Sequence, residues 1–156
     1  MGTVDIRRSA LASPYAARLI AALNAELTAL FPEPGATHFS LHDGQVVAGE
    51  GAFLVAWLDD AAVGCGAVRR LNETTGEIKR MYVDPSARGH GVGRALVEAL
   101  EAEARLIGLT TIVLETGTRL AAAIKLYEAM GYARIPLYGE YVASPDTSLC
   151  FGKSLG

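Results

Sequence analysis

The sequence is poor in cysteine, with only Cys65 and Cys150 among its 156 residues. Metal sites and redox pairs use closely spaced cysteines, and these two have no such spacing. We therefore expect two free thiols, each in a strand, and no disulfide, as is usual for a cytoplasmic protein.

Positive charge is also scarce. The 14 Lys and Arg residues are outnumbered by 17 Asp and Glu residues, which gives a formal net charge of −3. Domains that bind nucleic acid usually carry a basic stripe, so we expect no nucleic acid partner. A mild negative charge is compatible with an amine substrate.

No apolar run is long enough to cross a bilayer. The longest clear one, residues 52–58, is far below the roughly 20 residues that a spanning helix needs. Residues 1–9 lack the apolar centre of a signal peptide. These absences favour a cytoplasmic protein that has no membrane partner.

Histidine is rare, and only one pair has a metal-like spacing. His38 and His42 are four residues apart, which suits zinc when both lie on a helix. No helix is indicated there and no third ligand lies nearby, so we expect no metal. The pattern favours a mobile loop over residues 36–51, which could line a substrate mouth.

Strand and helix patterns alternate along the rest of the chain. Apolar residues at helical spacing follow Ser13-Pro14, a typical helix start, and the β-branched run at 110–114 indicates a buried strand. A strand, a helix and a strand over residues 77–114 require a parallel pair. The predicted fold class is α+β, with a mixed sheet of about seven strands flanked by helices. Strands are predicted at 4–7, 53–58, 63–70, 77–83, 110–114, 132–135 and 148–153, and helices at 14–31, 92–107 and 119–130.

A glycine-rich segment, residues 88–93 (Arg-Gly-His-Gly-Val-Gly), lies where a predicted strand turns into a predicted helix. Free N–H groups at a helix start bind anions, and glycine lets a phosphate approach the backbone. The segment lacks the Lys-Ser/Thr ending of a Walker A loop and the glycine spacing of a dinucleotide fingerprint. A diphosphate site is therefore indicated, with an ordinary glycine-rich turn as the alternative.

Three segments carry a family resemblance. Arg88, Gly91 and Gly93 fit Arg/Gln-x-x-Gly-x-Gly/Ala, which resembles the acetyl-CoA loop of the GCN5-related N-acetyltransferases (GNAT). Residues 126–132 (Leu-Tyr-Glu-Ala-Met-Gly-Tyr) and 77–85 resemble further segments of that family, in the same order. The resemblance covers nearly the whole chain and implies a single GNAT domain over residues 1–156, a splayed parallel strand pair, and acetyl-CoA as co-substrate without a metal. The closing segment resembles a bacterial subgroup of small-molecule acetyltransferases.

The resemblance implies a binding site made mainly of backbone. The strand edge at 81–83 would pair with the pantetheine arm and hold the thioester oxygen, while the loop holds the phosphates. We expect the ring of His90 to face solvent. The implied cofactor-binding residues are Met81, Tyr82, Val83, Arg88, Gly89, His90, Gly91, Val92, Gly93 and Arg94.

Two residues are candidates for proton transfer. Tyr127 would protonate the leaving thiolate, and the alternative is a core tyrosine on an amphipathic helix. Glu77 would take the proton of the amine, and the alternative is a surface carboxylate that pairs with Lys79 or Arg80. Leu120 stands where many family members carry Asn, so the polar contact made there is in doubt.

The acceptor site is only suggested by the sequence. A glutamate beside aromatic residues could hold an ammonium, and the candidates are Trp57, Tyr138, Glu140 and Tyr141 with the loop around His38. The same residues could instead pack a homodimer interface.

The sequence thus predicts an acetyl-CoA-dependent N-acetyltransferase. The acceptor would be a primary amine of a small molecule, an amino acid or an amine metabolite, which attacks directly in a ternary complex. The alternatives are a peptide or protein amine as acceptor, and a CoA-binding sensor module without activity.

Overall fold

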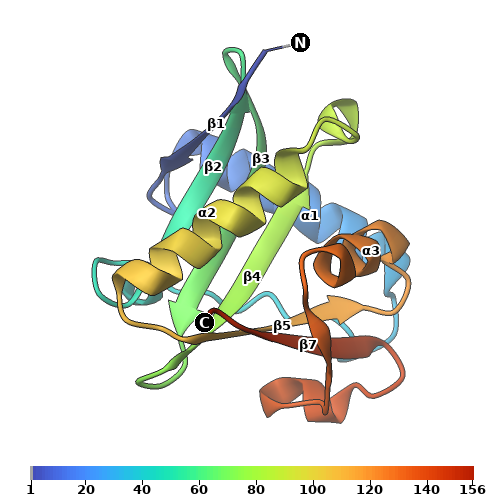
Figure 1. Cartoon of the computed structure of the whole chain (residues 1–156). Helices are drawn as coiled ribbons and strands as arrows, with labels where there is room; N and C mark the ends of the chain where they lie inside the picture. Colours follow the sequence, from blue (N-terminus) through green and yellow to red (C-terminus); the bar gives the residue numbers. More distant parts are fainter. Residues whose placement is uncertain (1) are drawn as a thin grey trace.

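The computed structural model describes residues 2–156 and contains a seven-stranded sheet with helices on both faces (Figure 1). The strand order is β1-β2-β3-β4-β5-β7-β6, and every neighbouring pair is antiparallel except β4 and β5. The predicted α+β fold with a mixed sheet and one parallel pair is confirmed. The strands are β1 (Val4–Arg8), β2 (Gly51–Leu58), β3 (Ala61–Arg70), β4 (Thr75–Val83), β5 (Thr111–Gly117), β6 (Ala133–Ile135) and β7 (Ser148–Ser154), and the helices are α1 (Pro14–Leu30), α2 (Val92–Leu106) and α3 (Ala121–Ala129).

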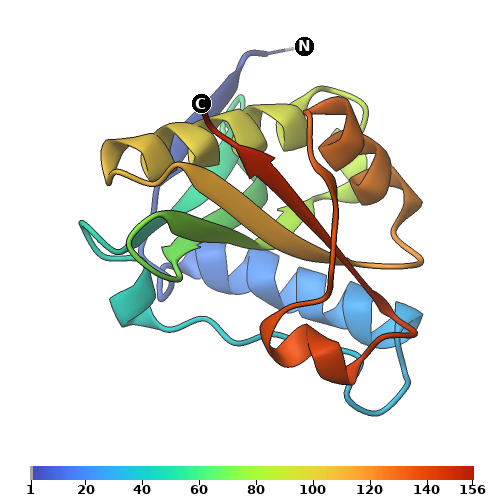
Figure 2. The same ribbon diagram turned by 60° about the horizontal axis from the view of Figure 1, so that its bottom comes forward.

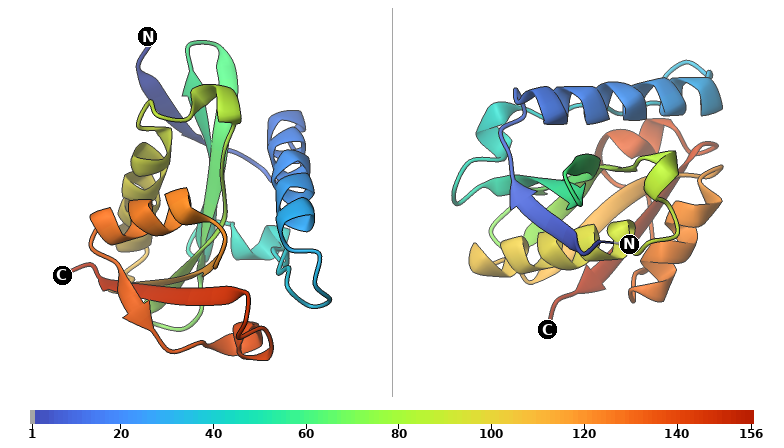
Figure 3. Two further views of the ribbon diagram at one scale, coloured as in Figure 1. Left: turned by 90° about the vertical axis from the view of Figure 1, so that its right-hand side faces the viewer. Right: turned by 90° about the horizontal axis from the view of Figure 1, so that it is seen from above.

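The helices divide between the two faces of the sheet. Helix α1 covers one face, and α2 and α3 cover the other (Figure 3). Each face has its own apolar core, a smaller one around Leu19 and Phe53 and a larger one around Leu96, Leu100 and Ile112. Burying apolar side chains on both faces stabilises the sheet as the central layer.

The start of α1 follows the signal in the sequence. The hydroxyl of Ser13 accepts a hydrogen bond from the N–H of Ala16 at 3.1 Å, and Pro14 is the first helical residue. Both features stabilise a helix start. They fix the position of α1, and the second half of this helix later forms one wall of the candidate site.

Strands β4 and β5 pair over a short stretch and then separate (Figure 1). Thr75–Ile78 pair with Thr111–Leu114, whereas no pairing on this side is found for residues 79–83 within the part of the chain described. At the point of separation Gly66 of β3 stands opposite two residues of β4, Arg80 and Met81, which is a β-bulge. The backbone of β4 beyond Ile78 is therefore left with an open edge.

Three segments depart from the predicted pattern. Helix α3 begins at Ala121 rather than at residue 119, because the N–H of Leu120 still closes a turn onto Gly117. The segment 36–51 contains a short 3-10 helix, η1 (Asp43–Gln45), and a second 3-10 helix that was not predicted, η3, spans Gly139–Ala143. Figure 2 shows η3 on the same side of the sheet as α1.

Both cysteines are buried and unpaired, Cys65 in β3 and Cys150 in β7, as predicted. Over residues 2–156, none of the helices has both the length and the apolar character that crossing a membrane requires.

Candidate active site

A cavity of about 630 Å³ lies where β4 and β5 separate. One wall is the second half of α1 with residues 36–38, and the opposite wall is the glycine loop with the start of α2 and residues 119–127 around α3. Residues 78–83 of β4 and 115–117 of β5 complete the lining. The cavity thus gathers most of the segments that the sequence singled out.

The glycine loop forms one end of the cavity. Gly89 and Gly91 have φ of 83° and 79°, in the left-handed region that favours glycine, and Gly91 is the N-cap of α2. Within the described chain, none of the N–H groups of residues 89–94 donates to a backbone carbonyl. A row of free donors at the start of a helix is the arrangement that binds phosphate.

The charged residues of the loop are less available than the sequence suggested. The guanidinium of Arg88 donates to the carbonyl of Val83 at 3.0 Å and pairs with Glu26 at 2.8 Å. Arg94 pairs with Glu98 at 3.2 Å on the surface. His90 is exposed, as expected. The backbone N–H groups of the loop are therefore free to bind an anion, whereas the charged side chains of Arg88 and Arg94 are already paired.

The open edge of β4 runs along the same cavity. Met81, Tyr82 and Val83 all contribute to its lining. Met81 and Val83 pack against the core on the α2 side, and Tyr82 packs on the α1 side. Their side chains are occupied in packing, so the backbone edge is what remains for a ligand to pair with.

Tyr127 of α3 lies in the cavity wall with only 4% of its surface exposed. Its ring packs edge-on against Tyr132, with the centroids 5.9 Å apart. Among residues 2–156, every fully buried polar atom of a side chain has a hydrogen-bond partner. The Tyr127 hydroxyl has no such partner there, so it is not fully buried. It therefore reaches the cavity that its side chain lines. Burial, and then the Glu115 carboxylate, raise the pKa of Tyr127, which keeps the phenol protonated.

Glu77 is not placed as the sequence suggested. It is fully buried rather than at an exposed strand edge, and it is absent from the cavity lining. Its carboxylate pairs with Arg69 at 2.8 Å and accepts hydrogen bonds from the hydroxyls of Tyr138 at 2.5 Å and Tyr141 at 2.8 Å. Neither Lys79 nor Arg80 is its ion partner. Glu77 therefore reaches the cavity only through Tyr141, and its role as a base stays a prediction.

A carboxylate that the sequence analysis missed does line the cavity. Glu115 lies on β5, just past the point where β4 separates, and burial raises its pKa. The hydroxyl of Ser148 donates to it at 2.6 Å. A polar residue at the carboxyl end of a buried parallel strand was the available signal, because ligands gather at such strand ends.

A chain of hydrogen bonds holds Glu115 in place from behind. The hydroxyls of Ser148 and Ser144 are 3.0 Å apart, and that of Ser144 is 2.9 Å from Nε2 of His38. Nδ1 of His38 is 2.8 Å from a carboxylate oxygen of Glu140. This chain fixes His38 in the wall. Within the described residues, no group of three or more His, Cys, Asp and Glu side chains is arranged to hold a metal ion.

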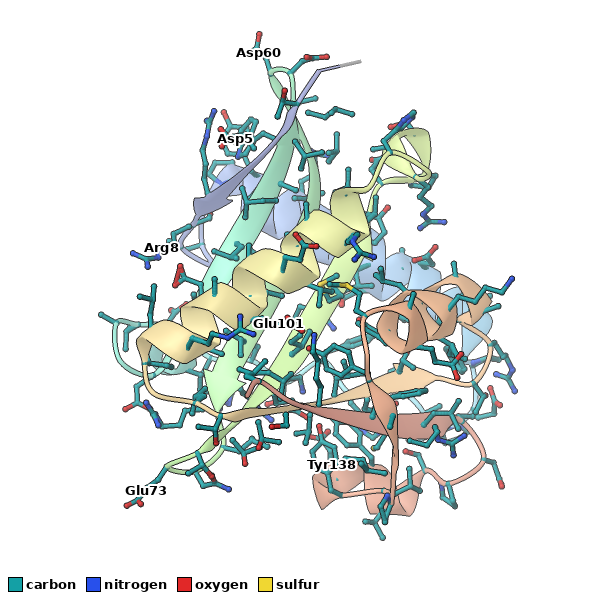
Figure 4. The ribbon with its side chains drawn as sticks, in the orientation of Figure 1. Asp5, Arg8, Asp60, Glu73, Glu101 and Tyr138 are labelled. Atoms are coloured by element: carbon teal, nitrogen blue, oxygen red, sulfur yellow. The ribbon has the colours of Figure 1, made fainter. Side chains whose placement is uncertain are left out.

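The acceptor candidates divide into two groups. Tyr141 lines the cavity, while Glu140 and Tyr138 support it through His38 and Glu77. Trp57 was wrongly placed there, because it pairs with Asp5 of β1 and packs against Tyr15. Figure 4 shows Asp5 and Tyr138 at opposite ends of the molecule.

Leu120, in place of the usual Asn, also lines the cavity. It is the residue before α3 and makes no side-chain cap. A leucine side chain offers no polar group to a ligand here, so the contact that Asn often makes from this position stays in doubt.

The sequence and fold match known proteins over nearly their whole length. A family model described as the acetyltransferase (GNAT) family matches residues 16–132. The chain belongs to the GNAT acetyltransferase family. An IAA acetyltransferase from Azospirillum brasilense is 40% identical over 147 residues, which cover 93% of this chain and 94% of the relative. The present protein is accordingly an N-acetyltransferase enzyme.

Solved structures agree with this assignment. A crystal structure described as an acyl-CoA N-acyltransferase from Klebsiella pneumoniae has a TM-score of 0.83 and 34% identity, and covers 99% of each chain. A GNAT family acetyltransferase from Elizabethkingia anophelis, solved with acetyl-CoA bound, has a TM-score of 0.71 and covers 99% of this enzyme and 100% of that chain. At 16% identity the latter likeness is one of fold alone.

Proposed function

We propose that this enzyme transfers the acetyl group of acetyl-CoA to a primary amine of a small molecule, an amino acid or an amine metabolite, by direct attack in a ternary complex. One observation carries the proposal: a single cavity joins the glycine loop, the hydroxyl of Tyr127 and the carboxylate of Glu115. An anion site, a proton donor and a proton acceptor are the three groups that this reaction needs.

The residues present fit acetyl-CoA. The free N–H groups of residues 89–94 suit its diphosphate, and the β4 edge at 79–83 suits the amides of its pantetheine arm. The same edge offers an N–H for the thioester oxygen. The positive φ at 89 and 91 favours glycine, and glycine has no Cβ to block the approach of the phosphates.

Each proton has an assigned group. Acetyl-CoA supplies an activated acetyl carbonyl, which the amine attacks while the C–S bond breaks. Glu115 takes one proton from the ammonium of the acceptor before the attack. Tyr127 donates a proton to the departing sulfur and recovers one from the new amide nitrogen, so the phenol is restored and the proton on Glu115 passes to solvent. Glu77 positions Tyr141 in the wall by accepting its hydrogen bond.

A small acceptor is favoured over a peptide. The end of the cavity away from the loop is bounded by residues 36–38 and by Tyr141 of η3. The relative from Azospirillum brasilense is named for acetylation of IAA rather than of a protein. A sensor module would not need both a free phenol and a carboxylate in the same cavity.

Release of free thiol from acetyl-CoA, measured with a panel of small amines and a panel of peptides, tests this proposal. We expect release with at least one small amine and none above background with peptides. Thiol release with peptides but with none of the small amines would make a peptide amine, rather than a small molecule, the acceptor. CoA binding by calorimetry without release from any amine would favour the sensor.

Gly91→Val should weaken CoA binding by more than about tenfold, because a side chain at the helix start displaces a phosphate from charged hydrogen bonds worth about 1.5–3 kcal/mol each. A Cβ at Gly91 would meet no protein atom within 4 Å, so the internal cost is backbone strain alone. Gly108→Val is a matched control, since Gly108 has φ of 83°, equally open surroundings and no place in the cavity. If calorimetry finds equal CoA affinity in both folded variants, the loop does not hold the phosphates.

A further inference from the structure

Two consecutive cations of β4 are buried in the cavity wall without a carboxylate partner. Lys79 is 6% exposed and Arg80 is 7% exposed, and both line the cavity. Within residues 2–156, neither has an Asp or Glu oxygen within 4.0 Å. The three other arginines of the cavity wall each pair with a glutamate. Buried charges are normally paired, so these two stand out.

The bulge in β4 is what brings the two side chains together. Consecutive side chains of a regular strand point to opposite faces of the sheet. Arg80 instead adopts a φ of 60°, which is strained for a residue other than glycine. Its guanidinium donates to the side chain of Asn24 in α1 and lies over the ring of Phe39 at 4.8 Å, on the α1 side.

The ammonium of Lys79 points to the same side and is weakly held. Its single hydrogen bond within the described chain runs to the hydroxyl of Tyr141 at a long 3.5 Å. That hydroxyl already donates its proton to Glu77, so it can accept a hydrogen bond from Lys79 but does not neutralise the positive charge of Lys79. Burial lowers the pKa of Lys79 and that of Arg80, as expected for cations whose loss of water is not fully offset.

Glu115 supplies the opposite charge in the same cavity. Ile78 pairs with Leu114 in the last register of the parallel pair, so Lys79 and Glu115 are the next residues on the two separating strands. The wall therefore presents an ammonium on β4 and a carboxylate on β5. The complement of such a wall is a small molecule that bears a carboxylate and an ammonium.

We infer that the acceptor is a primary amine that also carries a carboxylate, and that Lys79 binds this carboxylate while Arg80 adds positive charge and Glu115 faces the amine. The inference rests on the proposed function and narrows its acceptor class. It assigns an anion subsite to the end of the cavity opposite the phosphate loop.

Thiol release with matched acceptors tests the inference. Each amino acid is compared with its decarboxylated amine and with its amide, which keep the carbon skeleton and the amine. We expect kcat/KM to be at least about tenfold higher for the carboxylate member of the preferred set, since a hydrogen bond to a charged group is worth about 1.5–3 kcal/mol. Equal rates within every set would overturn the inference while leaving the acetyltransferase proposal intact. No release with any amine would overturn both.

Variants of Lys79 locate the subsite. Lys79→Met keeps the length of the side chain and removes its charge, so the preference for the carboxylate member should collapse mainly through KM. Lys79→Arg keeps the charge and should retain the preference. If the preference for the carboxylate member remains in both Lys79→Met and the double variant Lys79→Met/Arg80→Met, these two residues do not form an anion subsite.

A CoA titration shows whether these variants fold. If they do not, inhibition of the wild-type enzyme provides a second measurement. Carboxylic acids that lack an amine should compete with the acceptor, and their esters or alcohols should not. Absence of competition by the acids would contradict an anion subsite.

Discussion

We expect Tyr127→Phe to lower kcat by about 10²–10³-fold, the usual cost of removing one donor aimed at developing charge. The ring and its packing against Tyr132 are retained, so binding of acetyl-CoA should be nearly unchanged. A thiolate titrates near ~8.5, whereas burial raises the pKa of Tyr127 above its usual range. The phenol therefore stays protonated until the sulfur departs, and we propose that it then donates its proton as the C–S bond breaks. Steady-state kinetics beside a direct acetyl-CoA titration measures the two effects separately.

Tyr132→Phe is a matched control for this experiment. The hydroxyl of Tyr132 donates to Glu101 at 2.7 Å, away from the cavity. Its loss removes one hydrogen bond from the buried Glu101 carboxylate, which keeps its ion pair with Lys153 at 2.9 Å, so the melting temperature should fall slightly and kcat should stay nearly as it was. A kcat of Tyr127→Phe no lower than that of Tyr132→Phe would make Tyr127 a structural residue, with water as the proton source.

The parts of the site that depend on local sequence could be predicted. The loop at 88–93 is recognised by glycine spacing between a strand and a helix, and the structure places it between β4 and α2, with positive φ at Gly89 and Gly91. Tyr127 became a candidate through the family resemblance of residues 126–132, and its role stays a prediction. The order of strands and helices required a parallel pair, and β4 and β5 form it.

The proposed acceptor end could be predicted only in part, because it is assembled from distant segments: Tyr141 and the loop around His38 were candidates, whereas Glu115 was not. His38, Glu115 and Tyr141 belong to a loop, a strand and a short 3-10 helix that are brought together only by the fold. The sequence also cannot tell which face of the sheet a side chain occupies once a bulge interrupts the alternation. The bulge places Lys79 and Arg80 on one face, while Glu77 is enclosed by Arg69 and two tyrosines.

Glu115→Gln should lower kcat/KM at neutral pH by about 10³-fold, because the variant can use only acceptor that has already lost its proton. An alkyl ammonium titrates near ~10, so about one molecule in a thousand is a free amine at pH 7. This loss lies within the roughly 10²–10⁴-fold that positioned bases supply. The glutamine keeps the size of the side chain and an oxygen for the hydroxyl of Ser148.

The pH profile distinguishes Glu115 from Glu77 as the base. Burial raises the pKa of Glu115 above its ordinary 4.5, against opposing effects from Ser148 on β7, His38 in the loop and Lys79 on β4. A raised pKa means that the carboxylate form appears only as the pH rises through it, so wild-type kcat/KM should climb through that pKa and then level off. The kcat/KM of Glu115→Gln should instead rise about tenfold per pH unit up to the pKa of the amine. The difference in kcat/KM between the variant and wild type should therefore disappear at high pH.

Glu77→Gln is the decisive comparison, because the sequence alone points to Glu77. It leaves the half-buried Arg69 without its carboxylate, which should cost less than the roughly 3–5 kcal/mol of breaking a fully buried pair. We therefore expect a lower melting temperature for Glu77→Gln and a pH profile that still levels off as in wild type. A profile that rises with unit slope in Glu77→Gln, and levels off in Glu115→Gln, would instead assign the base to Glu77 acting through the hydroxyl of Tyr141.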